Sequence, residues 1–377
     1  MTKFSGRLPV VALLLQVLVL LVVATDAAAA YADGSLGPAR YARVFSFGNS
    51  LTDTGNAAIF PVTAGGPFTQ PPYGETYFGH PNGRSSDGRL IINFLVKKLK
   101  VPEPTPYLAG RTAADFLNGT NFAVGGATAL SPAFLASKGI TSLVPISLSN
   151  ETRWFQNVLQ LLMNSSDFAD KGKITASSVF YVGEIGVNDY FLALSSNSSI
   201  NVAVSLVPHI IGTIRSALTA MIAAGARTMV VTGMLPIGCE PQQLALFPGG
   251  PGDYDPTTGC IKRFNHVAEL HNLALKRMLG ELRLNHTGKS LSLLYADIYG
   301  PVVRALASPA AHGFGSRPLA ACCGGGGGPY NFNFTAFCGT PRSTACVDPA
   351  KSISWDGIHF TEAANRFITR AVLKGLF

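Results

Sequence analysis

The sequence predicts a three-layer α/β/α fold, with helices on both faces of a doubly wound, mostly parallel sheet. Short apolar runs recur along the chain without polar alternation, which is typical of strands that a parallel sheet buries on both faces. Segments with apolar residues at 3- and 4-residue spacing stand between these runs, and this alternation indicates βαβ units. Neither a repeat nor a linker divides the chain, so we expect residues 31–377 to form a single domain.

The four clearest strands are the runs ARVFSF, SSVFYVG, TMVVTGM and SLSLLYADI, at residues 42–47, 177–183, 228–234 and 290–298. The clearest helices are three amphipathic segments at residues 201–224, 260–284 and 361–376. Gly225 ends the first helix and Thr361 begins the last, as glycine and threonine commonly do. Two loops have low complexity: the Pro- and Gly-rich residues 61–83 and the five glycines at 324–328, which we expect nearby disulfides to anchor.

Residues 1–30 have the pattern of a cleaved secretory signal peptide. Lys3 and Arg7 give a basic start, an apolar stretch follows over 8–24, and four alanines at 27–30 suit a signal peptidase. The alternative is a membrane anchor, because the apolar stretch approaches the length that spans a bilayer. No other membrane span is predicted, so we expect a secreted, extracellular protein.

The 377-residue chain has a net charge of +8, which becomes +7 without Lys3, Arg7 and Asp26. Its basic residues are scattered, and no basic run is interleaved with aromatic residues. This argues against a nucleic-acid-binding protein. Two interpretations stay open: an affinity for acidic surfaces such as cell-wall polyanions, and an ordinary solvated basic surface.

Cysteines and sequons both indicate an oxidising, secretory compartment. An even number of cysteines predicts three disulfides, from Cys239, Cys260, Cys322, Cys323, Cys338 and Cys346. Of the fifteen possible pairings, we expect Cys239 to pair with Cys260 and the other four to pair among themselves. No paired C-x-x-C spacing is present, so no metal site is predicted. Six N-x-S/T sequons are glycosylation candidates on surface loops: Asn118, Asn150, Asn164, Asn197, Asn285 and Asn333.

The stretch VFSFGNSLTDTGN, at 44–56, places Ser50 just past the first strand and close to Gly48. Open parallel sheets hold their active sites at the carboxyl ends of strands, which favours Ser50 as a nucleophile. The alternative is a capping box, with Ser50 as N-cap of the next helix and Asp53 in its first turn. Ser50 could serve as nucleophile and as N-cap at once, because a helix N-terminus also favours the negative charge that develops in the reaction.

Of the seven histidines, His359 is the candidate base. It lies in SWDGIHFTEAANRF, three residues after Asp356, and Gly357 permits a tight turn that brings the carboxylate to Nδ1 and leaves Nε2 free. The alternative is an ordinary Asp-Gly turn beside a helix. Surface or packing positions are expected for the others: His80, His209, His266, His271, His286 and His312.

Two stretches offer donors for a developing oxyanion. NFAVGGATA, at 121–129, contains Gly125-Gly126, whose backbone N–H groups can face a ligand. VGEIGVNDY, at 182–190, places Asn188 beyond a buried strand, where its side-chain amide can donate. The ordinary alternatives are a glycine turn and a common Asn-Asp loop pair.

Together the blocks FGNSLTDTGN, NFAVGGATA, GEIGVNDY and SWDGIHFTEA, in this order over residues 44–367, resemble the GDSL lipases and esterases, a branch of the SGNH hydrolases. The stretch ACCGGGGGPYNFN around Cys322 is most similar to the plant secreted subfamily. Two positions depart from the family pattern: Asn49 stands where Asp is usual, and Val187 where a second Gly is usual. The first departure puts the surrounding hydrogen bonds in question, and neither removes a triad member. No G-x-S-x-G motif is present.

The resemblance implies an SGNH-type, flavodoxin-like fold and a secreted serine esterase of the apoplast, cell wall, vacuole or another secretory compartment. It implies Ser50 as nucleophile, His359 as base and Asp356 as its partner. It also implies an oxyanion hole from the Ser50 N–H, Gly126 and Asn188, and the adjacent glycines leave a one-residue shift open. No cofactor is implied. Two alternatives remain: transfer of the acyl group to a sugar or phenolic acceptor, and a cell-wall-binding glycoprotein without catalysis. The ester (polysaccharide, phenolic or lipid) and the oligomeric state stay open.

Overall fold

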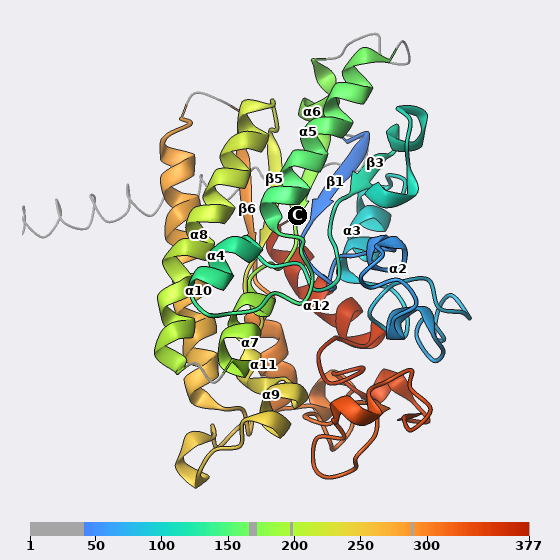
Figure 1. The fold of residues 1–377 in the computed structure, drawn as a ribbon, viewed down its shortest axis with the longest axis vertical. Coiled ribbons are helices and arrows are strands. Elements are labelled where there is room, and N and C mark those ends of the chain that lie inside the picture. The colour runs from blue at the N-terminus through green and yellow to red at the C-terminus, as the bar shows by residue number, and fades with distance from the viewer. Residues whose placement is uncertain (1–40, 166–171, 197–198, 288–289, 377) are drawn as a thin grey trace, which may run out of the picture.

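A computed structural model of the chain describes residues 41–165, 172–196, 199–287 and 290–376. The predicted signal peptide and the sequon at Asn197 lie outside these residues. In the described part, six parallel strands form one sheet in the order β2-β3-β1-β4-β5-β6 (Figure 1). The strands are β1 (Arg43–Phe47), β2 (Thr105–Pro106), β3 (Gly119–Asn121), β4 (Ser178–Val182), β5 (Thr228–Thr232) and β6 (Ser292–Ala296).

The four predicted strands are confirmed as β1, β4, β5 and β6, each shorter than the apolar run that predicts it. β1, β4 and β5 are buried along their whole length, which is why their sequences show no polar alternation. The sequence gives no signal for β2 or β3, because Thr-Pro and Gly-Thr-Asn form no apolar run.

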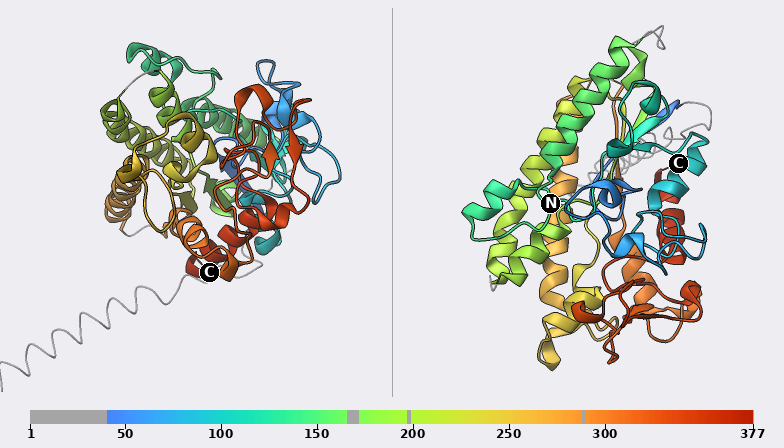
Figure 2. Two further views of the ribbon diagram at one scale, coloured as in Figure 1. Left: turned by 90° about the horizontal axis from the view of Figure 1, so that it is seen from below. Right: turned by 45° about the vertical axis from the view of Figure 1, so that its right-hand side comes forward.

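Helices cover both faces of the sheet, which confirms the predicted three-layer fold (Figure 2). One layer contains α5 (Leu148–Asn164), α8 (Ile200–Ala223) and α10 (Lys262–Leu284), and the other contains α3 (Ile91–Leu99), α11 (Tyr299–Ala307) and α12 (Glu362–Leu376). The three predicted helices are α8, α10 and α12. Shorter helices are α2 (Asn56–Ile59), α4 (Pro132–Ser137), α6 (Lys173–Ala176), α7 (Val187–Ser195) and α9 (Pro241–Leu246).

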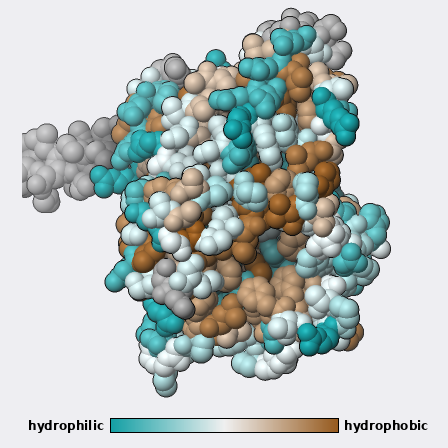
Figure 3. Space-filling model, in the orientation of Figure 1, coloured by the Kyte–Doolittle hydropathy of each residue, from teal (hydrophilic) through white to brown (hydrophobic). Residues whose placement is uncertain are grey.

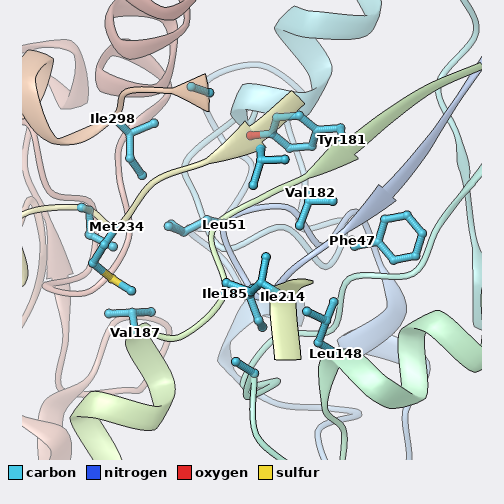
Figure 4. Close-up of a cluster of buried hydrophobic side chains, with 14 of the residues drawn as sticks. Phe47, Leu51, Leu148, Tyr181, Val182, Ile185, Val187, Ile214, Met234 and Ile298 are labelled. Carbon is cyan, nitrogen blue, oxygen red and sulfur yellow. The ribbon is translucent and has the colours of Figure 1, made fainter. Parts of the chain in front are cut away.

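The main core lies between the sheet and these helices. Figure 4 shows Phe47 and Val182, at the ends of β1 and β4, near Leu148 of α5 and Ile214 of α8. By length and composition α8 could cross a bilayer, but half of its apolar stretch is buried inside the molecule. It packs against α5, α7 and α10, so α8 serves as a core helix here.

The six cysteines form three disulfides: Cys239–Cys260, Cys322–Cys346 and Cys323–Cys338. The expected first pair is confirmed, and the adjacent Cys322 and Cys323 bond to different partners. The last two bonds anchor a segment that contains the five glycines and a small antiparallel pair, β7 (Cys323–Gly324) and β8 (Thr344–Ala345). Three of these cysteines share a second buried cluster with Tyr73 and Trp355, the residue before Asp356.

The strand order determines where loops meet. β1 lies between β3 and β4, so the chain leaves β1 toward one side of the sheet and later returns to the other. Doubly wound sheets bind their ligands at such a reversal, beyond the carboxyl ends of the strands. The loops after β1 and β3 carry Ser50 and Gly126, and the first turn of α7, which follows β4, carries Asn188.

Candidate active site

The turn after β1 aims Ser50 at the edge of the sheet. Gly48 has φ +134°, and a Cβ there would lie 3.0 Å from the Glu184 carbonyl oxygen, so only glycine fits. Ser50 follows this turn, and its side chain reaches the pocket described below.

Asp53 caps the next helix, and the capping interpretation of Ser50 is therefore wrong. The Asp53 carboxylate accepts hydrogen bonds from the N–H groups of residues 55–57, at 2.6 to 2.8 Å. It also accepts from the Gly125 N–H at 2.8 Å. One buried carboxylate thus binds the serine loop to the Gly-Gly loop after β3.

Ser50, His359 and Asp356 form a continuous hydrogen-bonded series. Ser50 Oγ lies 2.8 Å from His359 Nε2, and His359 Nδ1 lies 2.7 Å from Asp356 Oδ2. Exposed fractions are 8%, 3% and 1% respectively, so water has access mainly at the serine end. Residues 309 positions apart therefore meet in the geometry of a nucleophile, a base and an orienting carboxylate.

Asp356 is held by its own turn and by Tyr73. Its Oδ1 accepts from the backbone N–H groups of Ile358 and His359, at 2.9 and 2.8 Å, and Gly357 supplies the positive φ of +96° that the turn requires. The Tyr73 hydroxyl donates to Oδ2 at 2.7 Å. Burial by itself raises the pKa of Asp356, but the charge of His359 and these hydrogen bonds hold that pKa below its usual value.

Tyr73 is a site residue that sequence reasoning missed. It lies in the Pro- and Gly-rich loop, far from any quoted block, and the pattern around it carries no catalytic signal. Burial and the Asp356 carboxylate raise the pKa of Tyr73 well above its ordinary value, so its hydroxyl stays a donor.

Three groups around Ser50 are arranged as donors. In the described residues the N–H groups of Ser50 and Gly126 have no backbone or side-chain acceptor, whereas the Gly125 N–H is bound by Asp53. Gly126 has φ +84°, and a Cβ there would lie 2.6 Å from Val144. Asn188 donates one amide hydrogen to the Ala127 carbonyl at 2.8 Å, which leaves its second hydrogen for a ligand.

Further buried carboxyls bind the segments that carry these donors. Glu184 and Asp189 lie within the block GEIGVNDY and Glu151 lies outside the quoted blocks, and sequence reasoning gave none of the three a role. Burial raises the pKa of Glu151 well above its ordinary value, of Glu184 to about 8 and of Asp189 to about 7. Their hydrogen bonds are Glu151 with Gly48 N–H (2.8 Å), Glu184 with Asn49 Nδ2 (2.6 Å) and Val187 N–H (3.0 Å), and Asp189 with Ala129 and Leu130 N–H (2.8 and 2.9 Å).

A pocket of about 440 Å³ opens onto Ser50 and His359. Figure 3 shows the same face hollowed near its middle, with hydrophobic residues gathered around the hollow. Side chains far apart in the sequence supply its apolar lining: Pro67, Phe68, Leu143, Val144, Val187, Phe191, Leu192, Phe334, Phe337 and Ile358. Phe68 meets the His359 ring edge to face, at 5.5 Å between centroids.

The remaining histidines lie apart from this series. His271 is buried in α10, where its Nδ1 lies 3.0 Å from the Tyr190 hydroxyl, and burial lowers its pKa to about 3. It is a packing residue, as the sequence predicts. Among the described residues, no group of three or more His, Cys, Asp or Glu side chains is arranged to hold a metal ion.

Comparison with known proteins agrees with this architecture. The family model described as GDSL-like lipase/acylhydrolase matches residues 44–372. Three Arabidopsis thaliana proteins named GDSL esterase/lipase are 41%, 43% and 41% identical over 340, 336 and 335 residues. The alignments cover 88% of this chain in each case, and 84%, 82% and 84% of the relatives. The resemblance inferred from the four blocks is thereby confirmed: the chain belongs to the GDSL-like lipase/acylhydrolase family.

Proposed function

We propose that this chain is a secreted serine esterase that hydrolyses carboxylic esters through an acyl-enzyme on Ser50. The observation that carries the proposal is the series Ser50–His359–Asp356, with hydrogen bonds of 2.8 and 2.7 Å at the mouth of an apolar pocket. The relatives carry the name esterase/lipase, which is the same chemistry.

The reaction follows from the roles of these groups. His359 Nε2 takes the Ser50 proton while Oγ attacks the ester carbonyl carbon, and Asp356 stabilises the imidazolium. The tetrahedral intermediate collapses, its bond to the alcohol oxygen breaks, and His359 returns the proton to that oxygen. Water then attacks the acyl-serine by the same route and releases the acid.

The oxyanion is stabilised by the Ser50 and Gly126 N–H groups and the Asn188 side chain. Each donor contributes about 3 kcal/mol to the transition state when it is positioned in advance. Gly126 is the glycine proposed here, because Asp53 already uses the N–H of Gly125.

Secretion is the second part of the proposal. Three disulfides suit an oxidising compartment. The sequon asparagines Asn118, Asn164, Asn285 and Asn333 are exposed, Asn150 is half-buried, and all five remain glycosylation candidates. Peptide mass spectrometry of the secreted protein would find the mature N-terminus near residue 31 and the glycans on exposed sequons.

Ser50→Ala tests the catalytic proposal. The variant lacks the nucleophile, so we expect hydrolysis of a p-nitrophenyl ester to fall by at least about 10⁴-fold at an unchanged melting temperature. A serine-reactive phosphonate should label Ser50 in the parent, located by peptide mass spectrometry. Ser205→Ala, at an exposed serine of α8, is the matched control.

Each competing function has its own signature in the same experiment. Full activity of Ser50→Ala would contradict the mechanism. A parent that hydrolyses no ester and takes no phosphonate would indicate a binding glycoprotein. A new ester that forms on addition of a sugar or phenolic alcohol, faster than free acid appears, would indicate acyl transfer.

A further inference from the structure

Two polar side chains interrupt the apolar lining of the pocket without belonging to the reacting groups. They are Glu240, which is 7% exposed, and Gln242, which is 3% exposed. The hydroxyls of Thr63 and Thr340 also line the pocket, but these donate to the carbonyls of Ala57 and Phe337. A buried polar pair beside a catalytic serine needs an explanation, because burying polar groups without full hydrogen bonding is unfavourable.

The structure places this pair against the turn that carries His359. The Cys239–Cys260 disulfide holds the residue before Glu240. Two residues after Glu240, the backbone N–H of Gln242 donates to the Gly357 carbonyl at 2.9 Å. Glu240 and Gln242 therefore begin α9 in a fixed position next to the Asp356–His359 turn.

Both side chains have unused hydrogen-bonding capacity. In the described part of the chain, the Glu240 side chain bonds the Gln243 amide, and burial raises its pKa well above the ordinary value, which favours the protonated carboxyl with its O–H donor. The Gln242 side-chain oxygen is buried and has no partner among the described residues. The two groups offer a donor and an acceptor that the protein itself leaves unmatched.

In the proposed mechanism, one portion of the ester lies on the side of the pocket where Glu240 and Gln242 are. His359 returns its proton to the departing alcohol, so the alcohol portion lies on the His359 side of the scissile bond. The acyl portion then extends along the apolar lining. An alcohol portion that carries further hydroxyls can both accept from Glu240 and donate to Gln242, whereas an alkyl alcohol would leave both groups unmatched.

We propose that Glu240 and Gln242 form a subsite for the alcohol portion of the substrate, and that this alcohol is a polyol, either glycerol or a sugar. The proposal rests on the esterase function proposed above and adds the substrate class. Hydroxyl-binding sites discriminate strongly against analogues without the hydroxyl, since the buried polar groups then lose their partners.

The test compares three esters of octanoic acid: propyl octanoate, 2,3-dihydroxypropyl octanoate and 6-O-octanoylglucose. Release of octanoate gives kcat/KM for each, and the acyl portion is common to all. We expect the parent to prefer at least one polyol ester over the propyl ester by about tenfold. The better of the two polyol esters identifies the alcohol as glycerol or sugar.

Substitutions then assign the preference to the pair. Glu240→Met and Gln242→Met should each lower the polyol-to-propyl ratio by about 3- to 10-fold, the effect of one hydrogen bond. Glu240→Gln should largely keep the ratio, because its amide still donates. Leu143→Ala, in the apolar lining, should leave the ratio as it is. A melting temperature for each variant shows that the fold is retained, and either methionine variant suffices if the other does not fold.

The outcomes separate the subsite from the esterase function. Equal kcat/KM for propyl and polyol esters in the parent would overturn the subsite, as would methionine variants that slow all three esters alike. In either case, the esterase proposal would still stand if Ser50→Ala abolishes hydrolysis. Absence of hydrolysis of every ester would overturn the esterase proposal, and the subsite with it.

Discussion

The hydrogen bond between Asp356 and His359 determines which ring nitrogen of the proposed base carries its hydrogen. The carboxylate accepts the Nδ1 hydrogen of His359 and also receives the Tyr73 hydroxyl and two backbone N–H groups. The ring is thereby held with Nε2 toward Ser50 Oγ. The role proposed for Asp356 is orientation and charge stabilisation, which is compatible with its full burial.

Asp356→Asn should lower kcat by about 10³- to 10⁴-fold with little change in KM. The amide can present an N–H to Nδ1, which favours the tautomer that carries its hydrogen on Nε2 and cannot accept the serine proton. Steady-state hydrolysis of a p-nitrophenyl ester measures the change. Tyr73→Phe, which removes one donor and keeps the carboxylate, should cost far less. A kcat for Asp356→Asn within tenfold of the parent would contradict the role.

The hydrogen bonds of Asn49 explain why it can replace the aspartate that is usual in the family. Its Oδ1 accepts the Leu51 N–H at 3.0 Å, and its Nδ2 donates to the Glu184 carboxyl at 2.6 Å. An aspartate here would face that carboxyl directly, and the two acids would have to share a proton. The amide removes this requirement, and Glu184 continues the connection to Val187, beside Asn188.

Among the elements, the disulfide-closed segment supplies one wall of the pocket. Cys323–Cys338 closes it, and it carries Phe334 and Phe337 to the pocket lining. Five glycines within the same segment would otherwise leave it conformationally free. The bonds and the small buried cluster around Tyr73 and Trp355 hold it in place.

Phe337→Ala should reduce kcat/KM for an octanoyl ester about tenfold more than for an acetyl ester of the same alcohol. The ring offers apolar surface to a long acyl chain, and a partly exposed aromatic side chain contributes on the order of 1.5 kcal/mol by such burial. The measurement is the octanoyl-to-acetyl ratio. Tyr77→Ala, at an exposed aromatic outside the pocket lining, is the matched control and should leave the ratio unchanged. Equal losses on both esters would show that the ring acts on the fold and not on the acyl chain.

Over the whole molecule, the buried carboxyls make stability depend on pH. Burial raises the pKa of Glu184 from 4.5 to about 8 and of Asp189 from 3.8 to about 7. Between the lower and the higher value, the folded chain holds a proton that the unfolded chain has released. The free energy of unfolding therefore falls as pH rises through this range.

We expect the melting temperature to be highest near pH 4 to 5 and to fall by about 5 °C or more toward pH 8. Differential scanning calorimetry across this range measures it. Glu184→Gln cannot ionise and should flatten the decline, whereas Glu281→Gln, at a surface carboxyl paired with Arg215, should not. A melting temperature that rises between pH 5 and 8 in the parent would contradict the assignment.

Much of this protein could be predicted from the sequence because the signals are local. Continuous apolar runs mark strands buried on both faces, 3- and 4-residue spacing marks the helices that cover them, and glycines mark turns that only glycine can form. Ser50, Gly126, Asn188, Asp356 and His359 all follow from short blocks. The tertiary structure decided what has no local pattern: the bond from Gly125 to Asp53, the bond from Tyr73 to Asp356, the carboxyls that bind the loops, and the polar pair beside His359. These depend on contacts between residues distant in sequence, and the pairing of such residues is set by packing across the sheet.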